Sequence, residues 1–446
     1  MKVLVFAHTP PPHHGQSYMV QLMVEGFGGD YRERPRPARS PLGIECYLVN
    51  ARVSKKLEEI GDFRAIKLFL LFDYCLQAIW CRFRYGIHTF YFIPAPGKPS
   101  ALYRDWIVMF LCRPFFKHIV LHWHAAGLAK WLETVRQIRA RTLTYHALKH
   151  VDASIVLSES NRRDAEKFWP KQIKIVGNGI PDPCPGFREE LLPRRKARLA
   201  ARKQLVAGEP LTAAAREQAG GDPHIFKVVY LAHCTRPKGL FDALDAVALA
   251  NQQLTLANSA VRLRLTVAGQ FLDDSERVEF DQRIAAPDLQ LPQPPLFAQG
   301  ANADASRTGT AGAVEYVGFI SGAEKNRILA DSDCFCFPTY YTAEVFPVVV
   351  LEAIAFGAMV VTTRWRAIPE LLPRNYAGLV EARLPGKVAA AFLEMLERDD
   401  SEELRAMFLA HFTLERHLAN LAAALHSAEQ APACWTPDLL PQAHAC

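Results

Sequence analysis

The sequence predicts an α/β protein with two domains, each built around a parallel sheet. Its 446 residues exceed what one ordinary hydrophobic core holds. Short apolar runs alternate along the chain with segments whose apolar residues recur at helical intervals, a pattern typical of βαβ units. Turn residues interrupt this alternation after Val176, and it restarts at Phe226, so we expect two Rossmann-like domains rather than one.

The first domain is expected over residues 1–180. It opens with an apolar strand, a turn rich in Pro, His and Gly, and a helix that carries Met19, Leu22, Met23 and Phe27 at helical spacing. The expected elements, in order, are strand Lys2–Ala7, helix Ser17–Phe27, strand His88–Ile93, helix Ala101–Leu111, strand His118–His122 and strand Ala153–Leu157.

Residues 181–224 are expected to link the domains. The cluster GNGIPDPCPG begins the link, and Arg188–Lys203 is basic and rich in alanine. We expect this segment to form a solvated helix, and a contact with an anionic surface is the alternative.

The second domain is expected over residues 225–410, followed by a C-terminal helix and a loose tail over 411–446. Residues 286–312 lack periodicity and are rich in Pro, Gln, Ala, Gly and Thr, so we expect a flexible insertion there. The expected elements are a strand from Phe226, helix Phe241–Asn251, strands Arg262–Ala268, Glu315–Phe319 and Cys334–Phe337, helix Val348–Phe356, strand Met359–Thr363, and helices from Pro385 to about Ser427.

The composition indicates a soluble globular protein. Half of the residues are hydrophobic and 22% are charged, and 52 Lys+Arg against 46 Asp+Glu give a net charge of +6. This modest excess suits anionic ligands or an anionic membrane surface without choosing between them. The ten cysteines show no paired CxxC spacing, so we expect reduced, buried thiols, with Cys334 and Cys336 packed in the core on one side of a strand.

Two hydrophobic segments bear on localisation. The N-terminal MKVLVFAHTPPPHHGQ has a short apolar run and no small-residue cleavage site, so we expect no signal peptide and a cytoplasmic protein. The stretch Ile66–Trp80 is interrupted by Lys67 and Asp73 and is too short to cross a bilayer. It is either a buried domain helix or an amphipathic helix, flanked by Arg64, Arg82 and Arg84, that lies on the inner face of the cytoplasmic membrane.

The turn over Thr9–Ser17 is the first candidate for chemistry. Gly15 and Gln16 stand at the expected start of a helix, where a glycine lets the backbone approach a diphosphate and free N–H groups favour negative charge. The segment has no GxGxxG, which removes the main support for a nicotinamide or flavin dinucleotide site. A simple tight turn is the alternative.

The loop HCTRPKGLFDALDA is the second candidate. It places Arg236 and Lys238 just after a strand, where open α/β sheets bind their ligands. Two cations there can hold a diphosphate and stabilise it as it leaves, the role that a divalent metal takes elsewhere. A solvated basic loop is the alternative.

The segment PTYYTAEVFPVVVLEAIAFGAMVV is the third and most informative candidate. Pro347 suits a first helical turn, so we expect Val348 to begin a helix that carries Glu352, with Glu344 in the loop before it. A carboxylate can accept hydrogen bonds from two vicinal hydroxyls, so this pair can hold a ribose and a hexose. The helix N-terminus after Phe346 would face the phosphates.

These segments, together with HWHAAG, LSES, KIVGNGI, RLTVAG, VEYVGFIS and GAMVVTTRWRAIPEL, resemble the GT-B retaining glycosyltransferases of family 4, whose second domain carries E-x7-E. The resemblance implies two Rossmann-like domains with parallel sheets facing across a cleft. In such a site Glu352 holds the ribose, Glu344 contacts the transferred sugar, and Arg236 and Lys238 hold the diphosphate. Gly15 lies across the cleft, and His124 lies near sugar and acceptor; without the family, a His-x-His strand end would indicate a metal-ligand fragment or a polar edge.

The chain departs from the family pattern in two places. Ala232 and His233 replace the usual glycine and arginine after YL, so Arg236 matches the family arginine only approximately. Arg364, Trp365 and Arg366 replace the usual glycines before the final IPE, which indicates a rim that suits a particular acceptor. The DxD at residues 331–333 precedes an apolar strand, so we expect it to end a helix rather than to bind metal.

The expected function is transfer of a hexose from a nucleoside diphosphate sugar to an acceptor hydroxyl with retention, without metal or cofactor. The expected acceptor is a glycan or lipid-linked molecule of polysaccharide or glycolipid synthesis, and no nucleic acid is expected as a partner. A glycosyl-enzyme would need a carboxylate nucleophile that the sequence does not identify. The alternatives are a sugar-nucleotide epimerase of the same architecture and a non-catalytic scaffold that binds nucleotide sugars.

Overall fold

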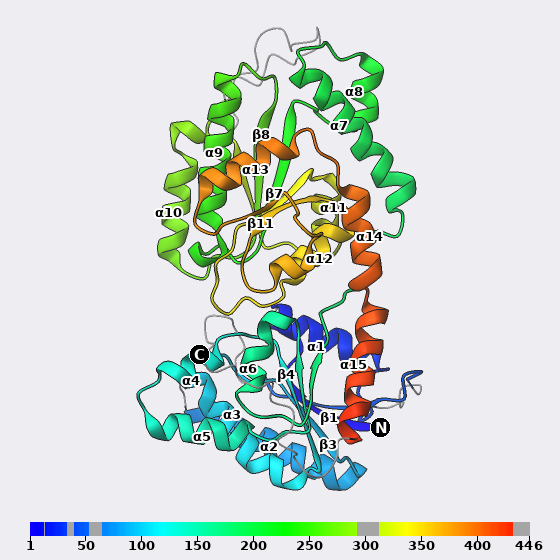
Figure 1. Ribbon diagram of the computed structural model, residues 1–446, viewed down its shortest axis with the longest axis vertical. Coiled ribbons are helices and arrows are strands. Elements are labelled where there is room, and N and C mark those ends of the chain that lie inside the picture. Colours follow the sequence, from blue (N-terminus) through cyan, green and yellow to red (C-terminus); the bar gives the residue numbers. More distant parts are fainter. Residues whose placement is uncertain (13, 34–39, 53–64, 292–311, 431–446) are drawn as a thin grey trace, which may run out of the picture. The chain divides into compact units, whose positions relative to one another are not determined.

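The computed structural model describes residues 1–12, 14–33, 40–52, 65–291 and 312–430. It contains two six-stranded parallel sheets, each flanked by helices on both faces, which confirms the α/β prediction (Figure 1). The chain divides into two compact units. The N-terminal unit comprises Met1–Gly179, Ala343–Phe346 and Leu414–Cys446, and the C-terminal unit comprises Ile180–Thr342 and Pro347–Thr413.

The sheet of the N-terminal unit has the strand order β2-β1-β3-β4-β5-β6. Strands β3 and β5 are buried along their whole length and β1 is buried from Val3 onward, as expected for a parallel sheet covered on both faces. The bounds are β1 Lys2–Ala7, β2 Glu45–Asn50, β3 Thr89–Phe92, β4 His118–Trp123, β5 Ala153–Val156 and β6 Ile173–Ile175.

Two helical layers cover this sheet. Helices α1 and α15 pack on one face, and α2, α3, α4, α5 and α6 pack on the other, as Figure 1 shows. The bounds are α1 Gly15–Gly26, α2 Ala65–Tyr85, α3 Pro99–Cys112, α4 Leu128–Thr134, α5 Ile138–Leu148, α6 Arg162–Glu166 and α15 Leu414–Glu429. The last helix of the described chain therefore belongs to the first unit, through an apolar face that includes Leu418, Leu421 and Leu425.

The sheet of the C-terminal unit has the strand order β12-β11-β10-β7-β8-β9. Read from β9, this is the 3-2-1-4-5-6 order of a Rossmann fold, with the change of direction between β7 and β10. The bounds are β7 Ile225–Leu231, β8 Arg262–Ala268, β9 Val314–Gly318, β10 Cys334–Phe337, β11 Met359–Thr363 and β12 Leu379–Val380.

The helices of this unit also form two layers. Helices α9 and α13 cover one face of the sheet, and α11 and α12 cover the other, where α14 packs on α12. Helices α7 and α8 pack against each other beside the core, and α10 packs on α9. The bounds are α7 Leu192–Val206, α8 Ala213–Ala219, α9 Leu240–Leu256, α10 Asp274–Ile284, α11 Gly322–Asp331, α12 Val348–Ala355, α13 Pro385–Met395 and α14 Ser401–His411.

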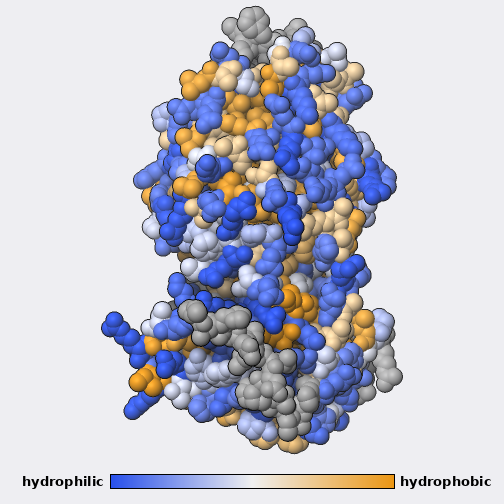
Figure 2. Space-filling model, viewed as in Figure 1, coloured by the Kyte–Doolittle hydropathy of each residue, from blue (hydrophilic) through white to orange (hydrophobic). Residues whose placement is uncertain are grey.

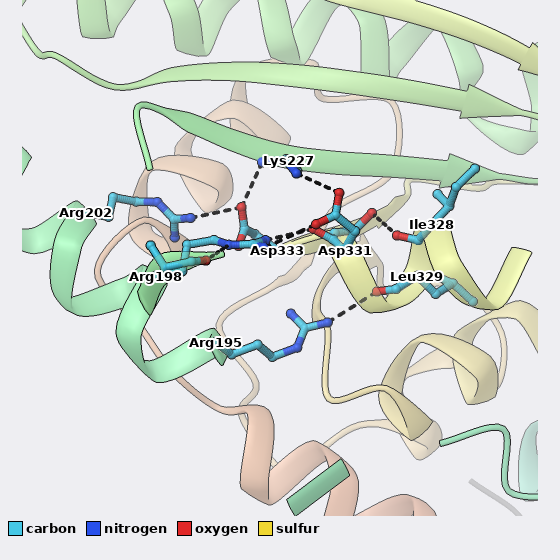
Figure 3. Close-up of polar contacts among 10 residues, drawn as sticks. Arg195, Arg198, Arg202, Lys227, Ile328, Leu329, Asp331 and Asp333 are labelled. Atoms are coloured by element: carbon cyan, nitrogen blue, oxygen red, sulfur yellow. Dashed lines mark hydrogen bonds and ion pairs between the residues drawn. The ribbon is translucent and has the colours of Figure 1, made fainter. Parts of the chain in front are cut away.

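The basic segment forms a helix, as predicted, but the prediction that this helix is solvated is wrong. Helix α7 buries three arginines, Arg195, Arg198 and Arg202, of which Arg198 and Arg202 are each 3% exposed (Figure 3). Arg198 lies 3.2 Å from carboxylate oxygens of both Asp331 and Asp333, and Arg202 lies 2.9 Å from Asp333. The sequence shows only the high charge of this segment, whereas the aspartates that draw the arginines inward lie about 130 residues further along the chain.

The same contacts give the DxD sequence a structural role. Asp331 ends α11 and Asp333 immediately precedes β10, as expected. The Asp333 carboxylate also accepts the backbone N–H of Lys227 at 2.9 Å, and the Lys227 ammonium reaches Asp331 at 2.6 Å. The two carboxylates thereby join α7, β7 and β10, and nearby arginines hold the pKa of the Asp333 carboxyl below its usual value against the opposing effect of burial.

Other sequence predictions have mixed outcomes. Cys334 and Cys336 are buried in the core of the C-terminal unit, as predicted. The greater part of the predicted insertion 286–312 and the predicted loose tail from residue 431 lie outside the described residues. Across the helices that are described, none has the length and apolar character needed to cross a membrane.

Candidate functional site

The sequence-predicted site residues fall at the carboxyl ends of the two parallel sheets. In the N-terminal unit, strand β1 has β2 on one side and β3 on the other, so the loops after β1 and β3 leave the sheet in opposite directions. Ligands of open α/β sheets bind at such a point. The loop after β1 leads to Gly15 and Gln16 in the first turn of α1. His124 directly follows β4, the strand that pairs with β3.

A capping box sets the start of α1. The His14 ring accepts the backbone N–H of Ser17 through Nδ1 at 3.3 Å, and the Ser17 hydroxyl accepts the backbone N–H of His14 at 3.2 Å. With Nδ1 of His14 acting as acceptor, its Nε2 carries the hydrogen that is shared with Nε2 of His8, 2.9 Å away. Burial and the neighbouring cationic groups lower the pKa of His8 to about 4.

A second pair of histidines lies at the end of β4. The His122 ring is 1% exposed, and its Nδ1 lies 2.5 Å from the hydroxyl of Tyr91 on β3. The rings of His122 and His124 are 4.2 Å apart. Burial, with smaller effects of His417 and His14, lowers the pKa of His124 to about 3, and burial also lowers the pKa of His122. Both rings are therefore neutral near pH 7 and can exchange hydrogen bonds with hydroxyl groups.

The C-terminal unit has its own point where the strand order reverses, between β7 and β10. The loop after β7 holds Arg236 and Lys238, and the loop after β10 leads to α12. The two loops touch through the backbone, since the Tyr340 N–H donates to the Pro237 carbonyl at 2.8 Å. Gly239 has φ +83°, and a β-carbon there would lie 2.3 Å from the Pro338 carbonyl oxygen, so only glycine allows this approach.

The two cations of the loop after β7 have different surroundings. The Lys238 ammonium lies 5.5 Å from the ring centre of Phe337 and 4.9 Å from that of Tyr341, on the side of β10. The Arg236 guanidinium lies 4.3 Å from the Phe241 ring and pairs with the Glu279 carboxylate on α10. Lys238 therefore lies at the point where the strand order reverses, whereas Arg236 is held toward α10.

The predicted glutamates also differ. Helix α12 begins at Val348 after Pro347, as expected, and places Glu352 on its second turn. The Glu352 side chain is 9% exposed and accepts from the ammonium of Lys325, on α11, at 2.5 Å. Glu344 is half-buried, and its segment Ala343–Phe346 groups with the N-terminal unit.

Phe346 is fixed within the N-terminal unit. Its carbonyl accepts from the side-chain amide of Asn178 at 3.2 Å. Its ring lies so close to Gly177 that a β-carbon there would approach the ring to 2.9 Å. The stretch before α12 is therefore anchored on the loop after β6.

The residues that replace the family's usual glycines brace the loop after β10. The Trp365 indole N–H donates to the Tyr341 carbonyl at 2.8 Å, and the Arg366 guanidinium donates to the Thr342 carbonyl at 3.1 Å. Arg366 itself has φ +53°, a conformation that a glycine adopts without strain. Trp365 and Arg366 therefore hold the loop after β10 through their side chains.

Sequence reasoning missed Lys325, Tyr91 and His122. Lys325 precedes its partner Glu352 by 27 residues, and no local motif marks it. His122 alternates with His124 along one strand, a visible signal, but the Tyr91 partner becomes apparent only once β3 pairs with β4. The described residues contain no group of three or more His, Cys, Asp or Glu side chains placed to hold a metal ion.

Comparison with known proteins connects this arrangement to a family. Residues 225–398 match the family model of glycosyl transferases group 1. The match begins at β7 and includes Arg236, Lys238, Lys325, Glu344 and Glu352. The amylovoran biosynthesis glycosyltransferase AmsK of Erwinia amylovora is 30% identical over 106 residues, which cover 23% of this chain and 26% of that protein, so the match spans about a quarter of that relative.

Solved structures resemble the chain over nearly its whole length. A sucrose-phosphate synthase from Thermosynechococcus elongatus has a TM-score of 0.61 at 15% identity and covers 97% of this chain and 100% of that chain. The Anabaena protein HepE, solved with UDP and glucose, has a TM-score of 0.57 at 15% identity and covers 95% of this chain and 99% of that chain. A glycosyltransferase from Rickettsia africae has a TM-score of 0.60 at 10% identity, with 97% and 99% covered. The fold is the GT-B fold of these glycosyltransferases.

Proposed function

We propose that this protein is a retaining, metal-independent glycosyltransferase of family 4 that moves a hexose from a nucleoside diphosphate sugar to an acceptor hydroxyl. The observation that carries the proposal is that the two elements flanking the strand reversal of the C-terminal sheet carry a cation and a buried carboxylate. Lys238 lies in the loop after β7, and Glu352, paired with Lys325, lies on the helix that follows β10. A cation there suits a diphosphate, and a buried carboxylate nearby suits the two hydroxyls of a ribose.

Lys325 has a specific part in this proposal. A carboxylate that is only 9% exposed would be costly to keep charged without a partner. The Lys325 ammonium contacts Oε1, which leaves Oε2 of Glu352 and the remaining lone pairs available to vicinal hydroxyls. Lys325 is thus proposed to orient the Glu352 carboxylate for the ribose.

The chemical step is proposed as attack on the same face of the sugar from which the diphosphate leaves. The acceptor oxygen forms a bond to the anomeric carbon, the bond from that carbon to the β-phosphate oxygen breaks, and a phosphate oxygen takes the acceptor's proton. Lys238 stabilises the charge that grows on the diphosphate. Arg236 is proposed to stabilise the same charge once its ion pair with Glu279 has opened.

The N-terminal unit is proposed to bind the transferred sugar and the acceptor. His124 and His122 are neutral, so they can donate and accept hydrogen bonds to sugar hydroxyls without attracting a second anion. Glu344 groups with this unit and is proposed to hold the hexose, while Gly15 and Gln16 lie at the start of α1 beside these rings.

The relatives support the proposed donor and acceptor classes. HepE is solved with UDP and with UDP-glucose, which makes UDP the first nucleotide to test. AmsK is named for the biosynthesis of amylovoran, which supports a growing glycan or a lipid-linked saccharide as acceptor.

The experiment that tests the function is a transfer assay with UDP-hexoses and glycan or lipid-linked acceptors in the presence of EDTA. We expect a glycoside with the anomeric configuration of the donor, identified by proton NMR. Glu352→Gln should abolish most of the product, and Glu403→Gln, which changes an exposed glutamate of α14, is the matched control. An inverted product, or a complete dependence on added metal, would contradict the mechanism, and nucleotide binding without product would favour a scaffold.

A further inference from the structure

Helix α2 of the N-terminal unit has two opposite apolar faces. One face, with Leu71, Cys75, Ala78 and Cys81, is buried against the sheet. The other carries five large apolar side chains that are exposed to solvent, at 74%, 46%, 65%, 57% and 66% for Phe69, Phe72, Leu76, Trp80 and Phe83. Single exposed apolar residues are ordinary, but a contiguous row marks a contact surface.

The spacing makes this row straight. Successive members are three, four, four and three residues apart, which keeps them within one stripe along the helix. At 1.5 Å per residue the stripe is about 21 Å long. The sequence alone could not choose between a buried helix and an amphipathic surface helix, and the structure shows that α2 has both kinds of face.

The apolar stripe continues onto the neighbouring elements. The ring of Phe115, in the 3₁₀ turn that follows α3, lies 6.0 Å from that of Phe83. On α3, which packs on α2, Tyr103 and Phe110 are 51% and 44% exposed and are seven residues apart on one face. The exposed rings thus extend across two adjacent helices.

Cationic side chains border the stripe. At the C-terminal end of α2, the guanidinium of Arg82 lies 5.6 Å from the ring centre of Phe83, and that of Arg84 lies 5.5 Å from that of Tyr85. Lys67 lies near the other end, and the one acidic residue of α2, Asp73, accepts a hydrogen bond from Gln77.

Helix α5 and the segment before it add to the positive charge on the same side of the sheet. Arg136, Arg139 and Arg141 are exposed there, next to Ile138, which is 73% exposed. Figure 2 shows orange and blue side chains together at the lower left, where Figure 1 draws α4 and α5.

We propose that the outer face of α2, with its extension onto α3 and α5, docks on an anionic lipid bilayer. Phenyl and indole rings partition into the boundary between headgroups and acyl chains, and arginines beside them contact lipid phosphates. A second copy of the chain fits this face less well, because a symmetric dimer through it would bring the cationic borders of the two copies together, whichever way the helices run. This inference goes beyond glycosyl transfer and does not depend on it.

The test is flotation of the full chain with vesicles of phosphatidylcholine containing 30% phosphatidylglycerol, compared with phosphatidylcholine alone. The protein should float with the anionic vesicles and much less with the neutral ones. Phe72→Ser/Leu76→Ser/Trp80→Ser should weaken vesicle binding by about tenfold or more, because each change removes apolar area from the stripe. Leu256→Ser/Val278→Ser/Leu409→Ser is the matched control, since it replaces exposed apolar residues of the C-terminal unit, and it should bind like the wild type.

A charge variant completes the test. Arg84→Gln/Arg139→Gln/Arg141→Gln should lose binding at low salt, and raising the salt from 0.1 to 1 M should reproduce this loss in the wild type, because the screening length falls from about 10 Å to about 3 Å. Vesicle binding that all variants retain would overturn the proposal. So would an absence of vesicle binding, including the case of a wild-type dimer that the triple serine variant converts to monomer. Unchanged far-UV circular dichroism spectra and thermal midpoints of the variants would show that they are folded, and neither readout depends on the proposed function.

Discussion

The carboxyl ends of the two sheets carry different chemistry on related frameworks. In the N-terminal unit, paired neutral rings gather there, His8 with His14 and His122 with His124. In the C-terminal unit the corresponding region holds an ammonium over aromatic rings at Lys238 and a buried ion pair between Lys325 and Glu352. Both regions lie beside a strand at which the connections reverse direction.

The difference teaches that each edge suits a ligand group of a different charge. Burial disfavours a charged histidine, so the N-terminal edge offers hydrogen bonds without net charge. The C-terminal edge keeps its charges because each buried one has an opposite partner. A diphosphate therefore suits the second edge, and sugar hydroxyls suit the first.

The largest expected effect concerns structural charge in the C-terminal unit. Asp333→Ala leaves Arg198 and Arg202 buried without their shared carboxylate and should destabilise the fold by about 3–5 kcal/mol. Urea unfolding measures this change. Asp281→Ala, on exposed α10, is the control and should cost less than about 1 kcal/mol. A stable Asp333→Ala protein that lacks only activity would contradict the structural role of Asp333. It would indicate instead that the DxD at residues 331–333 belongs to the functional site.

The next effect concerns the charge that acts on the substrate. Lys238→Ala should lower kcat by about 100-fold or more with little change in stability, because the cation acts mainly on the leaving diphosphate. Steady-state kinetics with the donor varied would measure it. Lys196→Ala, which breaks an exposed ion pair with Glu402, should keep normal turnover. Near-normal turnover of Lys238→Ala would contradict the proposal that Lys238 stabilises the leaving diphosphate.

A smaller effect sharpens the role of the buried pair. Lys325→Met should raise the KM for the donor by about tenfold, because the buried Glu352 carboxylate loses the partner that positions it. Combining it with Glu352→Gln should give a loss well below the product of the single losses. If the loss in the double variant equals the product of the two single losses, Lys325 does not act through Glu352.

The smallest expected effect is the change in stability between pH 7 and pH 6 that each of His8 and His124 causes. Their pKa values in the folded state lie below the ordinary 6.5, at about 4 for His8 and about 3 for His124. Below pH 6.5 the unfolded chain therefore binds protons that the folded chain excludes, so stability is full above this pH and falls as the pH is lowered toward 4. Each histidine should contribute less than about 1 kcal/mol between pH 7 and 6.

Urea unfolding at several pH values measures this dependence. His8→Gln should make it shallower, and His411→Gln, an exposed residue of α14, should leave it unchanged. Equal stability from pH 7 to pH 5 would contradict the neutral state of these rings.

The sequence predicted most of the fold because strands and helices of α/β domains have local signatures. The strand Lys2–Ala7 and the helix after Pro347 were predicted nearly to the residue, from an apolar run and from a proline at a helix start. The placement of α15 in the N-terminal unit depends on contacts with α1 and with strands far earlier in the chain, so no local pattern revealed it.

The positions of two candidate site residues were predictable, and their roles stay predictions. Lys238 lies in the loop after β7 and Glu352 on the second turn of α12, as expected. Partners were not predictable: Glu279 for Arg236 and Lys325 for Glu352 come from other helices. The charge of α7 was misread for the same reason, since burial of an arginine depends on a carboxylate that only the folded chain brings near it.

The most direct measurement of the charged edge is thermal unfolding of the wild type and of Lys238→Ala with UDP, GDP and ADP in the presence of a chelator. One nucleotide should raise the midpoint of the wild type clearly, since a ligand at about 100 times its dissociation constant adds about 2.7 kcal/mol, and Lys238→Ala should lose most of this shift. If no nucleotide shifts the folded wild type, or if Lys238→Ala shifts as much as the wild type, the C-terminal edge does not hold the diphosphate.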